Sequence, residues 1–169
     1  ASDLEKVLDQ ILLAAFAVCG QRCTAVSRVI VHRDIEEAVV SGLAARAAAM
    51  EPMDGMIEGA KIGPLASAQQ LEDVAGFVSR AVSDGAVIAA GGHRLESPGG
   101  GYIYAPTILR GVTRDMEIAR QEVFGPVLSL IAYDTVDEAL SIANDTAFGL
   151  SSCLYSERTD LVERFVAES

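Results

Sequence analysis

Short apolar segments of strand length alternate with longer amphipathic segments along this chain, and that alternation limits the possible folds more than any other feature. Residues 28–32 and 127–133 are runs rich in valine, isoleucine and leucine, a composition typical of strands that are buried on both faces. Residues 86–90 are a further expected buried strand, and residues 149–155 are another expected strand. Residues 102–109 are expected to be extended with an irregularity at their proline. Strands that alternate with helices predict an α/β fold, with a mainly parallel sheet and flanking helices.

The remaining segments have apolar residues at helical spacing. Ser2 and Glu5 form an expected capping box at the start of the first helix, and Gly20 is expected at its end. Residues 51–67 read as a loop. The sequence predicts four more helices, at residues 34–50, 69–84, 136–144 and from 159 onwards, with Asp34 capping the first of these and Asp134 or Thr135 the third.

Composition excludes several classes of protein. The chain has 169 residues, half of them apolar, which is enough for one domain with its own core. Its formal net charge is −11, and an acidic surface disfavours nucleic acid and anionic membranes as partners. No apolar run approaches the eighteen or so residues of a membrane span. Three cysteines argue against a disulfide framework and favour a reducing compartment such as the cytoplasm. With two histidines and no Cys-x-x-Cys pair, we expect no metal site.

Cys23 is the first candidate for chemistry. It follows Gly20 by three residues, and two polar residues separate them on an otherwise apolar path, so this loop is expected to reach the surface or a cleft. Backbone N–H groups freed at such a turn stabilise a thiolate and the oxyanion that forms when it attacks a carbonyl. Cys19 and Cys153 are expected to be packing residues, because most free cysteines are buried and inert.

Residues 122–127, with the sequence Glu-Val-Phe-Gly-Pro-Val, form a second candidate motif. The glycine–proline pair forces a turn immediately before a buried strand, which exposes Glu122 and Phe124. A carboxylate is a good acceptor for two neighbouring hydroxyls, and an aromatic face packs against a flat ring. Taken alone, the motif reads as a solvated glutamate and a core phenylalanine. The presence of Cys23 upstream favours a functional site.

Both motifs resemble signatures of the aldehyde dehydrogenase superfamily. The first is the order Phe-x-x-x-Gly-Gln-x-Cys-x-Ala-x-Ser, which ends at Ser27, and the second is Glu-Val-Phe-Gly-Pro. Segments at residues 62–65, 104–109 and 143–150 resemble further family segments in the same order. The resemblance implies oxidation of an aldehyde or semialdehyde to a carboxylic acid with NAD or NADP, through a thiohemiacetal and a thioester on a cysteine.

The resemblance also implies a role for individual residues. Cys23 is the expected nucleophile, and its backbone N–H contributes to the oxyanion hole. Glu122 is expected to bond the nicotinamide ribose hydroxyls, and Phe124 to pack near the nicotinamide. The stretch around Cys23 resembles the semialdehyde-oxidising branch, including enzymes for 2-oxoglutarate semialdehyde. Arg22 would then attract an acidic substrate, with a surface or structural salt bridge as the alternative.

The resemblance covers only the catalytic-domain portion of the family. The N-terminal cofactor domain and the C-terminal oligomerisation segment are absent from this sequence, as are the general-base glutamate and the asparagine that completes the oxyanion hole. We therefore expect residues 1–169 to be a single, truncated catalytic domain that does not perform NAD-dependent oxidation alone. Family members are dimers or tetramers, so the parent enzyme is expected to be a homo-oligomer.

Two other functions fit parts of the sequence. A thiol esterase or acyltransferase would use Cys23 with a histidine base. His32 is the nearer candidate for that base, although its place at the end of a strand favours a structural role. A non-catalytic acidic interaction domain would keep the fold without activity, and the intact Cys23, Glu122 and Phe124 argue against it.

Overall fold

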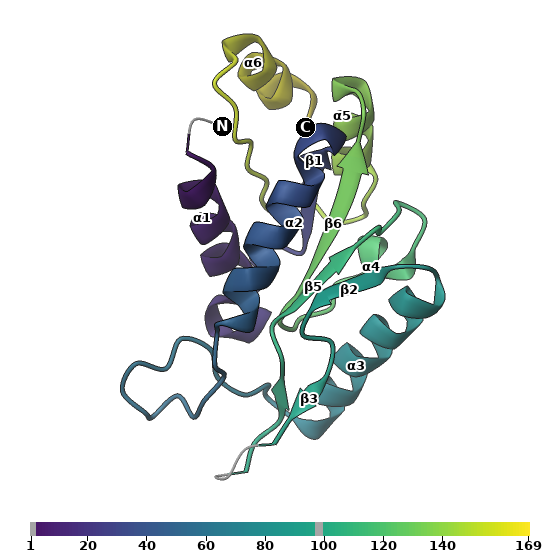
Figure 1. Ribbon diagram of the computed structural model, residues 1–169. Coiled ribbons are helices and arrows are strands. Elements are labelled where there is room, and N and C mark those ends of the chain that lie inside the picture. Colours follow the sequence, from purple (N-terminus) through teal and green to yellow (C-terminus); the bar gives the residue numbers. More distant parts are fainter. Residues whose placement is uncertain (1–2, 97–99) are drawn as a thin grey trace.

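The fold is built on a four-stranded sheet with the strand order β1-β6-β5-β2 (Figure 1). The computed structural model describes residues 3–96 and 100–169. Strands β1 (Arg28–His32) and β5 (Thr107–Arg110) run parallel to the central strand β6 (Val127–Tyr133). Strand β2 (Val87–Ala90) pairs antiparallel with β5. The predicted α/β fold with a mainly parallel sheet is therefore confirmed.

Helices cover both sides of this sheet. Helices α1 (Leu4–Phe16) and α2 (Arg33–Ala48) lie together on one side, and α3 (Ala68–Ser83) and the short α4 (Glu117–Arg120) lie on the other (Figure 1). The chain ends with α5 (Val136–Asn144) and α6 (Thr159–Glu168). Among the described residues, no helix has the length and hydropathy to cross a membrane.

The core lies between the helices and the sheet. Central strand β6 is buried from Val127 to Ile131, because it has neighbours on both edges and helices on both faces. A small hairpin of β3 (Arg94–Leu95) and β4 (Ile103–Tyr104) projects from the sheet. As predicted, the extended stretch that contains β4 and β5 is interrupted at Pro106. The largest fully buried side chains include Phe16, Leu8, Leu43, Ile108, Leu109, Leu128 and Leu130.

Two of the strand predictions are wrong. Residues 149–155 form no strand; they run as an irregular, exposed segment in which Leu150 is 63% exposed. An apolar run becomes a strand only when a neighbouring strand supplies backbone partners, and this segment has none within the described part of the chain. Strand β2 exists but is not buried, since Val87 is 56% exposed. It is an edge strand, paired only with β5.

Helix boundaries differ from the sequence-based expectation at three ends. The N-cap of α1 is Asp3, whose side chain accepts a bond from the Lys6 N–H at 3.1 Å; the expected cap Ser2 lies outside the described residues. Helix α2 begins after His32. The Nδ1 of His32 accepts a bond from the Asp34 N–H at 3.2 Å, so His32 is the cap and Asp34 is not. The α1 helix ends at Phe16 rather than near Gly20. Of the two expected caps of α5, Thr135 is the one used.

Candidate active site

The turn that leads to the candidate nucleophile begins with strained backbone. After α1 ends, Ala17–Gly20 form a 3-10 segment in which Val18 and Cys19 have φ values of 56° and 57° and Gly20 has 67°. A β-branched residue such as valine rarely adopts this left-handed conformation, which costs on the order of 1–3 kcal/mol per strained residue. Cys19 is buried, at 2% exposure, and desolvation raises the pKa of its thiol to about 12. The expectation that Cys19 is a packing residue is confirmed.

Cys23 lies in the exposed turn that follows. The Ala25 N–H donates to the Arg22 carbonyl at 3.0 Å, which closes the turn around Cys23, and the Val26 N–H donates to Ala14 of α1 at 3.2 Å. Cys23 is exposed, as the polar neighbours in its sequence predict. Cys153 is exposed as well; it lies in the irregular segment 149–155, so its predicted burial in a strand is wrong.

Arg22 is engaged with the protein itself. Its guanidinium donates to the Ala14 carbonyl near the end of α1 at 3.3 Å. Its Nε is buried and has no hydrogen-bond partner among the described residues. In this conformation Arg22 fixes the cysteine turn to α1, and the salt bridge considered from the sequence does not form with any of the described residues.

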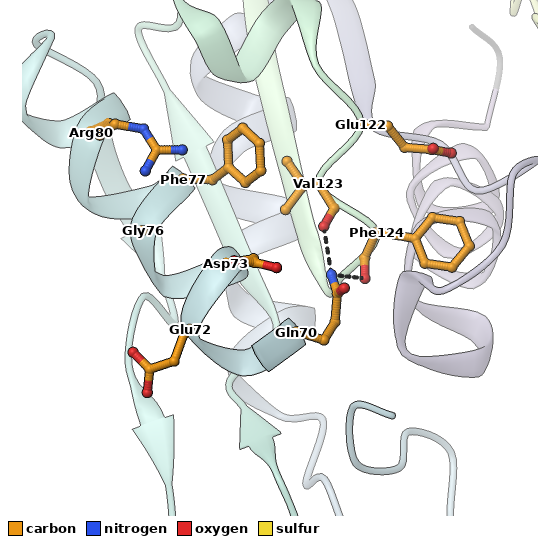
Figure 2. A pocket seen from close by; sticks show the side chains of 9 residues that line it. All are labelled: Gln70, Glu72, Asp73, Gly76, Phe77, Arg80, Glu122, Val123 and Phe124. Carbon is orange, nitrogen blue, oxygen red and sulfur yellow. Dashed lines mark hydrogen bonds between the residues drawn. The ribbon is translucent and has the colours of Figure 1, made fainter. Parts of the chain in front are cut away.

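The second motif forms a turn immediately before β6. Val123 is buried at 6% exposure, whereas Phe124 is 37% exposed and adopts a left-handed conformation with φ of 54°. Glu122 is exposed. Figure 2 shows the side chains of Glu122 and Phe124 directed away from Phe77 and Arg80 of α3. The glycine–proline turn therefore exposes the two predicted residues.

The two turns meet through their main chains. A Cβ atom added to Gly20 would lie 2.2 Å from the carbonyl oxygen of Gly125, so only a residue without a side chain permits this approach. On its other side Gly125 faces α3, where an added Cβ would lie 2.4 Å from Cγ2 of Val74. The structure thus brings the turn that carries Cys23 against the turn that carries Glu122 and Phe124, although they are far apart in the sequence.

Two glutamines that the sequence did not single out connect this region. Gln70, in the first turn of α3, donates its side-chain amide to the carbonyls of Val123 and Phe124, both at 3.0 Å (Figure 2). Gln21 accepts a bond from the Ala66 N–H at 2.9 Å. A polar residue in the first turn of a helix or in a loop carries no local signal of such a contact, because the partners come from distant parts of the chain.

Comparison with known proteins agrees with the two motifs. The sequence model of the aldehyde dehydrogenase family matches residues 1–169. The chain belongs to the aldehyde dehydrogenase family. The resemblance inferred from the motifs is therefore confirmed over the whole sequence.

Individual aldehyde dehydrogenases give the extent of the similarity. The chain is 38% identical over 169 residues to the alpha-ketoglutaric semialdehyde dehydrogenase of Bacillus subtilis (strain 168), covering 99% of this chain and 35% of that protein. It is 41% identical over 162 residues to aminoaldehyde dehydrogenase 1, peroxisomal, of Pisum sativum, covering 96% and 32%. The crystal structure of an NAD-dependent aldehyde dehydrogenase from Sinorhizobium meliloti superposes with a TM-score of 0.93 at 36% identity, covering 98% of this chain and 33% of that one. The chain spans about a third of the length of these relatives.

The second turn has the chemistry to hold part of a nicotinamide nucleotide, the cofactor that the aldehyde dehydrogenase family implies. The exposed Glu122 carboxylate forms no ion pair with the residues that the structure describes, so both oxygens are available to hydroxyl donors. The exposed face of Phe124 can pack against a flat ring. A surface depression of about 400 Å³ lies on the α3 side of this turn, whereas the Glu122 and Phe124 side chains are directed away from Phe77 and Arg80 of that helix (Figure 2).

His32 does not fit the role of a base for Cys23. It stands at the far end of β1 from the cysteine turn, and a strand of five residues spans roughly 13 Å. Its ring packs edge-on against Tyr133, with centroids 5.2 Å apart, while its Nδ1 caps α2. The expected structural role of His32 is therefore confirmed. The nearer of the two histidines is thus not placed to act as the base that a thiol esterase would need.

Proposed function

We propose that this chain supplies the nucleophile and the nicotinamide-side residues of an enzyme that oxidises an aldehyde or semialdehyde to a carboxylic acid with NAD or NADP. One observation carries the proposal: the exposed turn of Cys23 is held directly against the turn that exposes Glu122 and Phe124, through the contact between Gly20 and Gly125. This contact supports a thiol nucleophile and a nicotinamide site that would lie next to each other.

Cys23 would act as the nucleophile. Its thiolate adds to the carbonyl carbon of the aldehyde, which forms a thiohemiacetal and places negative charge on the former carbonyl oxygen. The backbone N–H of Cys23 has no acceptor among the described residues, so it is available to donate a hydrogen bond to that oxyanion. The small neighbouring residues Thr24 and Ala25 leave room for the substrate.

Glu122 and Phe124 would hold the cofactor beside this thiol. The Glu122 carboxylate would accept hydrogen bonds from two ribose hydroxyls, and Phe124 would pack beside the nicotinamide ring. When bound, the nicotinamide supplies an acceptor for the hydride that leaves the substrate carbon, after which the acyl group remains as a thioester on Cys23. Water then releases the acid, and the base that activates this water is outside the present sequence.

The substrate proposal is a semialdehyde. Support comes from the sequence around Cys23 and from the 38% identity with the alpha-ketoglutaric semialdehyde dehydrogenase. The competing class is an aminoaldehyde, the substrate named for the Pisum sativum relative. We expect the full-length gene product to have a higher kcat/KM for 2-oxoglutarate semialdehyde than for an ω-aminoaldehyde. The reverse order would contradict the proposal on substrate and leave the reaction type unaffected.

We also propose a domain organisation, an oligomeric state and a compartment for the parent protein. Residues 1–169 would be a single catalytic domain, with most of the cofactor site and the oligomerisation segment contributed by the rest of a homo-oligomeric parent. The sparse cysteines favour a reducing compartment, and we propose the cytoplasm. Light scattering of the full-length product would test the oligomeric state, and a monomer would contradict it.

The reaction type is tested by replacing the nucleophile. In the full-length product, Cys23→Ser is expected to remove NADH formation from aldehyde, because an alcohol is a far weaker nucleophile than a thiolate at neutral pH. Cys153→Ser, which changes the other exposed cysteine, is the control and is expected to remain active. The 169-residue chain itself is expected to form no NADH at an enzyme-like rate. An active Cys23→Ser enzyme would contradict the proposed function.

A further inference from the structure

The side-chain amide of Gln70 uses both of its hydrogens on one turn. It donates to the carbonyls of two consecutive residues, Val123 and Phe124, each at 3.0 Å (Figure 2). In an extended chain, consecutive peptide groups face opposite sides, so two adjacent carbonyls do not reach the same donor. The left-handed conformation of Phe124, with φ of 54°, turns them to the same side. A non-glycine residue holds that conformation only when its surroundings stabilise it.

Gln21 forms a matching connection from the cysteine turn. Its Oε1 accepts a bond from the Ala66 N–H at 2.9 Å, and its Nε2 faces the Pro64 carbonyl at 3.4 Å. Ser67, the next residue along, caps α3 by accepting a bond from the Gln70 N–H at 3.1 Å. Gln21 therefore bonds to the short stretch of residues 64–70, and Gln70 extends from that same stretch to the other turn.

We propose that Gln21 and Gln70 are positioning residues that fix the orientation of the two turns relative to each other. The contact between Gly20 and Gly125 sets how closely the turns approach, and the pairing of β1 with β6 holds the strands that follow them; the two glutamines add side-chain bonds that hold the turns themselves. Gln21 fixes the turn of Cys23 to residues 64–70, and Gln70 fixes the turn of Glu122 and Phe124 to the same residues. The inference rests on the proposed function, since it assigns these glutamines to the alignment of nucleophile and cofactor.

The first test measures backbone motion in the 169-residue chain by ¹⁵N relaxation. In Gln70→Leu, the order parameters of Val123 and Phe124 are expected to fall from the rigid value of about 0.85 towards or below about 0.6. Gln69→Leu is the matched control, because Gln69 precedes Gln70 on α3 and, within the described residues, its side chain bonds only to Asp73 of the same helix, at 2.8 Å. Unchanged order parameters in Gln70→Leu, or an equal loss in Gln69→Leu, would overturn the proposal.

Gln70→Glu gives a second variant with a pH-dependent readout. An ionised carboxylate only accepts hydrogen bonds, so it repels the two carbonyls; once protonated, it donates one. The amide shifts of Val123 and Phe124 are therefore expected to move towards the wild-type positions as the pH falls from about 7 to about 4, through the ordinary glutamate pKa of about 4.3, each variant being compared with wild type at the same pH. Shifts that stay equally displaced across this range, or that never leave the wild-type positions, would overturn the assignment of donor to Gln70.

The third test uses the full-length product. Gln70→Leu is expected to lower kcat/KM for aldehyde oxidation by about tenfold or more, since small misplacements of reacting groups are costly. Alkylation of Cys23 by iodoacetamide is expected to stay within about twofold, because the thiol itself is untouched. If Cys23→Ser is inactive and Gln70→Leu has the same kcat/KM as Gln69→Leu, only the positioning role is contradicted. An active Cys23→Ser enzyme would instead contradict the proposed function.

Discussion

Cys19 and Cys23 are four residues apart and occupy opposite environments. Cys19 is 2% exposed, and burial raises the pKa of its thiol to about 12. Cys23 is exposed on a turn. The left-handed residues between α1 and Gly20 cause this difference, because they direct the chain out of the core within a single turn. One short segment thus contains a thiol that is protected from reagents and one that is accessible to them.

Alkylation of the three thiols at different pH values tests this contrast. Cys19 is expected to react slowly at every pH up to about 10, since its raised pKa keeps it protonated and its burial excludes the reagent. Cys23 is expected to react faster than Cys153, which is also exposed and therefore controls for accessibility. The measurement is the rate of iodoacetamide modification of each cysteine by mass spectrometry. A rate for Cys23 no higher than for Cys153 would show that the turn does not activate it.

Gly125 has little room for a side chain. A methyl group there would lie 2.4 Å from Cγ2 of Val74, which is fully buried and, as a β-branched residue in a helix, has essentially one rotamer. We expect Gly125→Ala to lower the free energy of unfolding by about 1–3 kcal/mol, as overpacked cores do. Urea denaturation measures this loss. Gly149→Ala, at a site with open space, is expected to change stability by less than about 1 kcal/mol.

Among the helices, α3 affects the candidate site most directly, because Ser67 is its N-cap and Gln70 lies in its first turn. The Ser67 hydroxyl caps the helix and thereby fixes the backbone from which Gln70 extends. Helix α5 has a similar cap at Thr135, which accepts a bond from the Glu138 N–H at 3.2 Å, but α5 carries no residue of the candidate site.

A pair of cap variants separates stability from positioning. Ser67→Ala and Thr135→Ala are each expected to lower the free energy of unfolding by about 1 kcal/mol, the usual cost of losing a cap. Only Ser67→Ala is expected to shift the backbone amide signals of Val123 and Phe124, since only α3 reaches that turn. Equal shifts in both variants would mean that the turn responds to general destabilisation.

Elements with a strong local pattern were predictable from the sequence. The ranges of β1, β6 and α5 agree with the prediction, because the composition of a buried strand and the spacing of an amphipathic helix are properties of the segment itself. Strand β2 and residues 149–155 were mispredicted, because burial and pairing depend on neighbours elsewhere in the chain. Local composition does not distinguish an edge strand from a central one.

The same distinction holds within the candidate site. The exposure of Cys23, Glu122 and Phe124 follows from glycine and proline nearby in the sequence. The contributions of Gln21 and Gln70 do not, because each bonds to residues more than forty positions away. The early end of α1 was also unpredictable, since a left-handed valine and cysteine contradict their intrinsic preferences.

At the scale of the whole molecule, arginines form ion pairs with several of the surface carboxylates, and Asp145 is one of these. Asp145, on the loop after α5, accepts bonds from Arg114 and Arg120, each at 2.9 Å. These bonds connect the end of α5 to α4 and the residues just before it. The Arg114 guanidinium beside it lowers the pKa of the Asp145 carboxyl below its ordinary value of 3.8.

The pH dependence of stability follows from this shift. Since the pKa is lowered in the folded state, the stabilisation is fully present above about pH 4 and is lost as the pH falls through the folded pKa. Asp145→Asn is therefore expected to have a lower Tm than wild type at pH 7, and the difference should shrink at pH 3 and below. Thermal unfolding followed by circular dichroism measures both values. A difference that stays constant down to pH 2 would contradict the assignment.

The contact between Gly20 and Gly125 has a consequence for sequence variation in this part of the chain. Main-chain atoms alone form it, so it does not depend on which side chains flank either glycine. Positions beside Cys23 such as Thr24 and Ala25, whose side chains form no hydrogen bond or ion pair with the described residues, can therefore be randomised in a library while the spacing of the two turns is preserved. Changes in substrate preference selected at these positions would arise without relocation of the thiol, which makes this turn a suitable starting point for directed evolution.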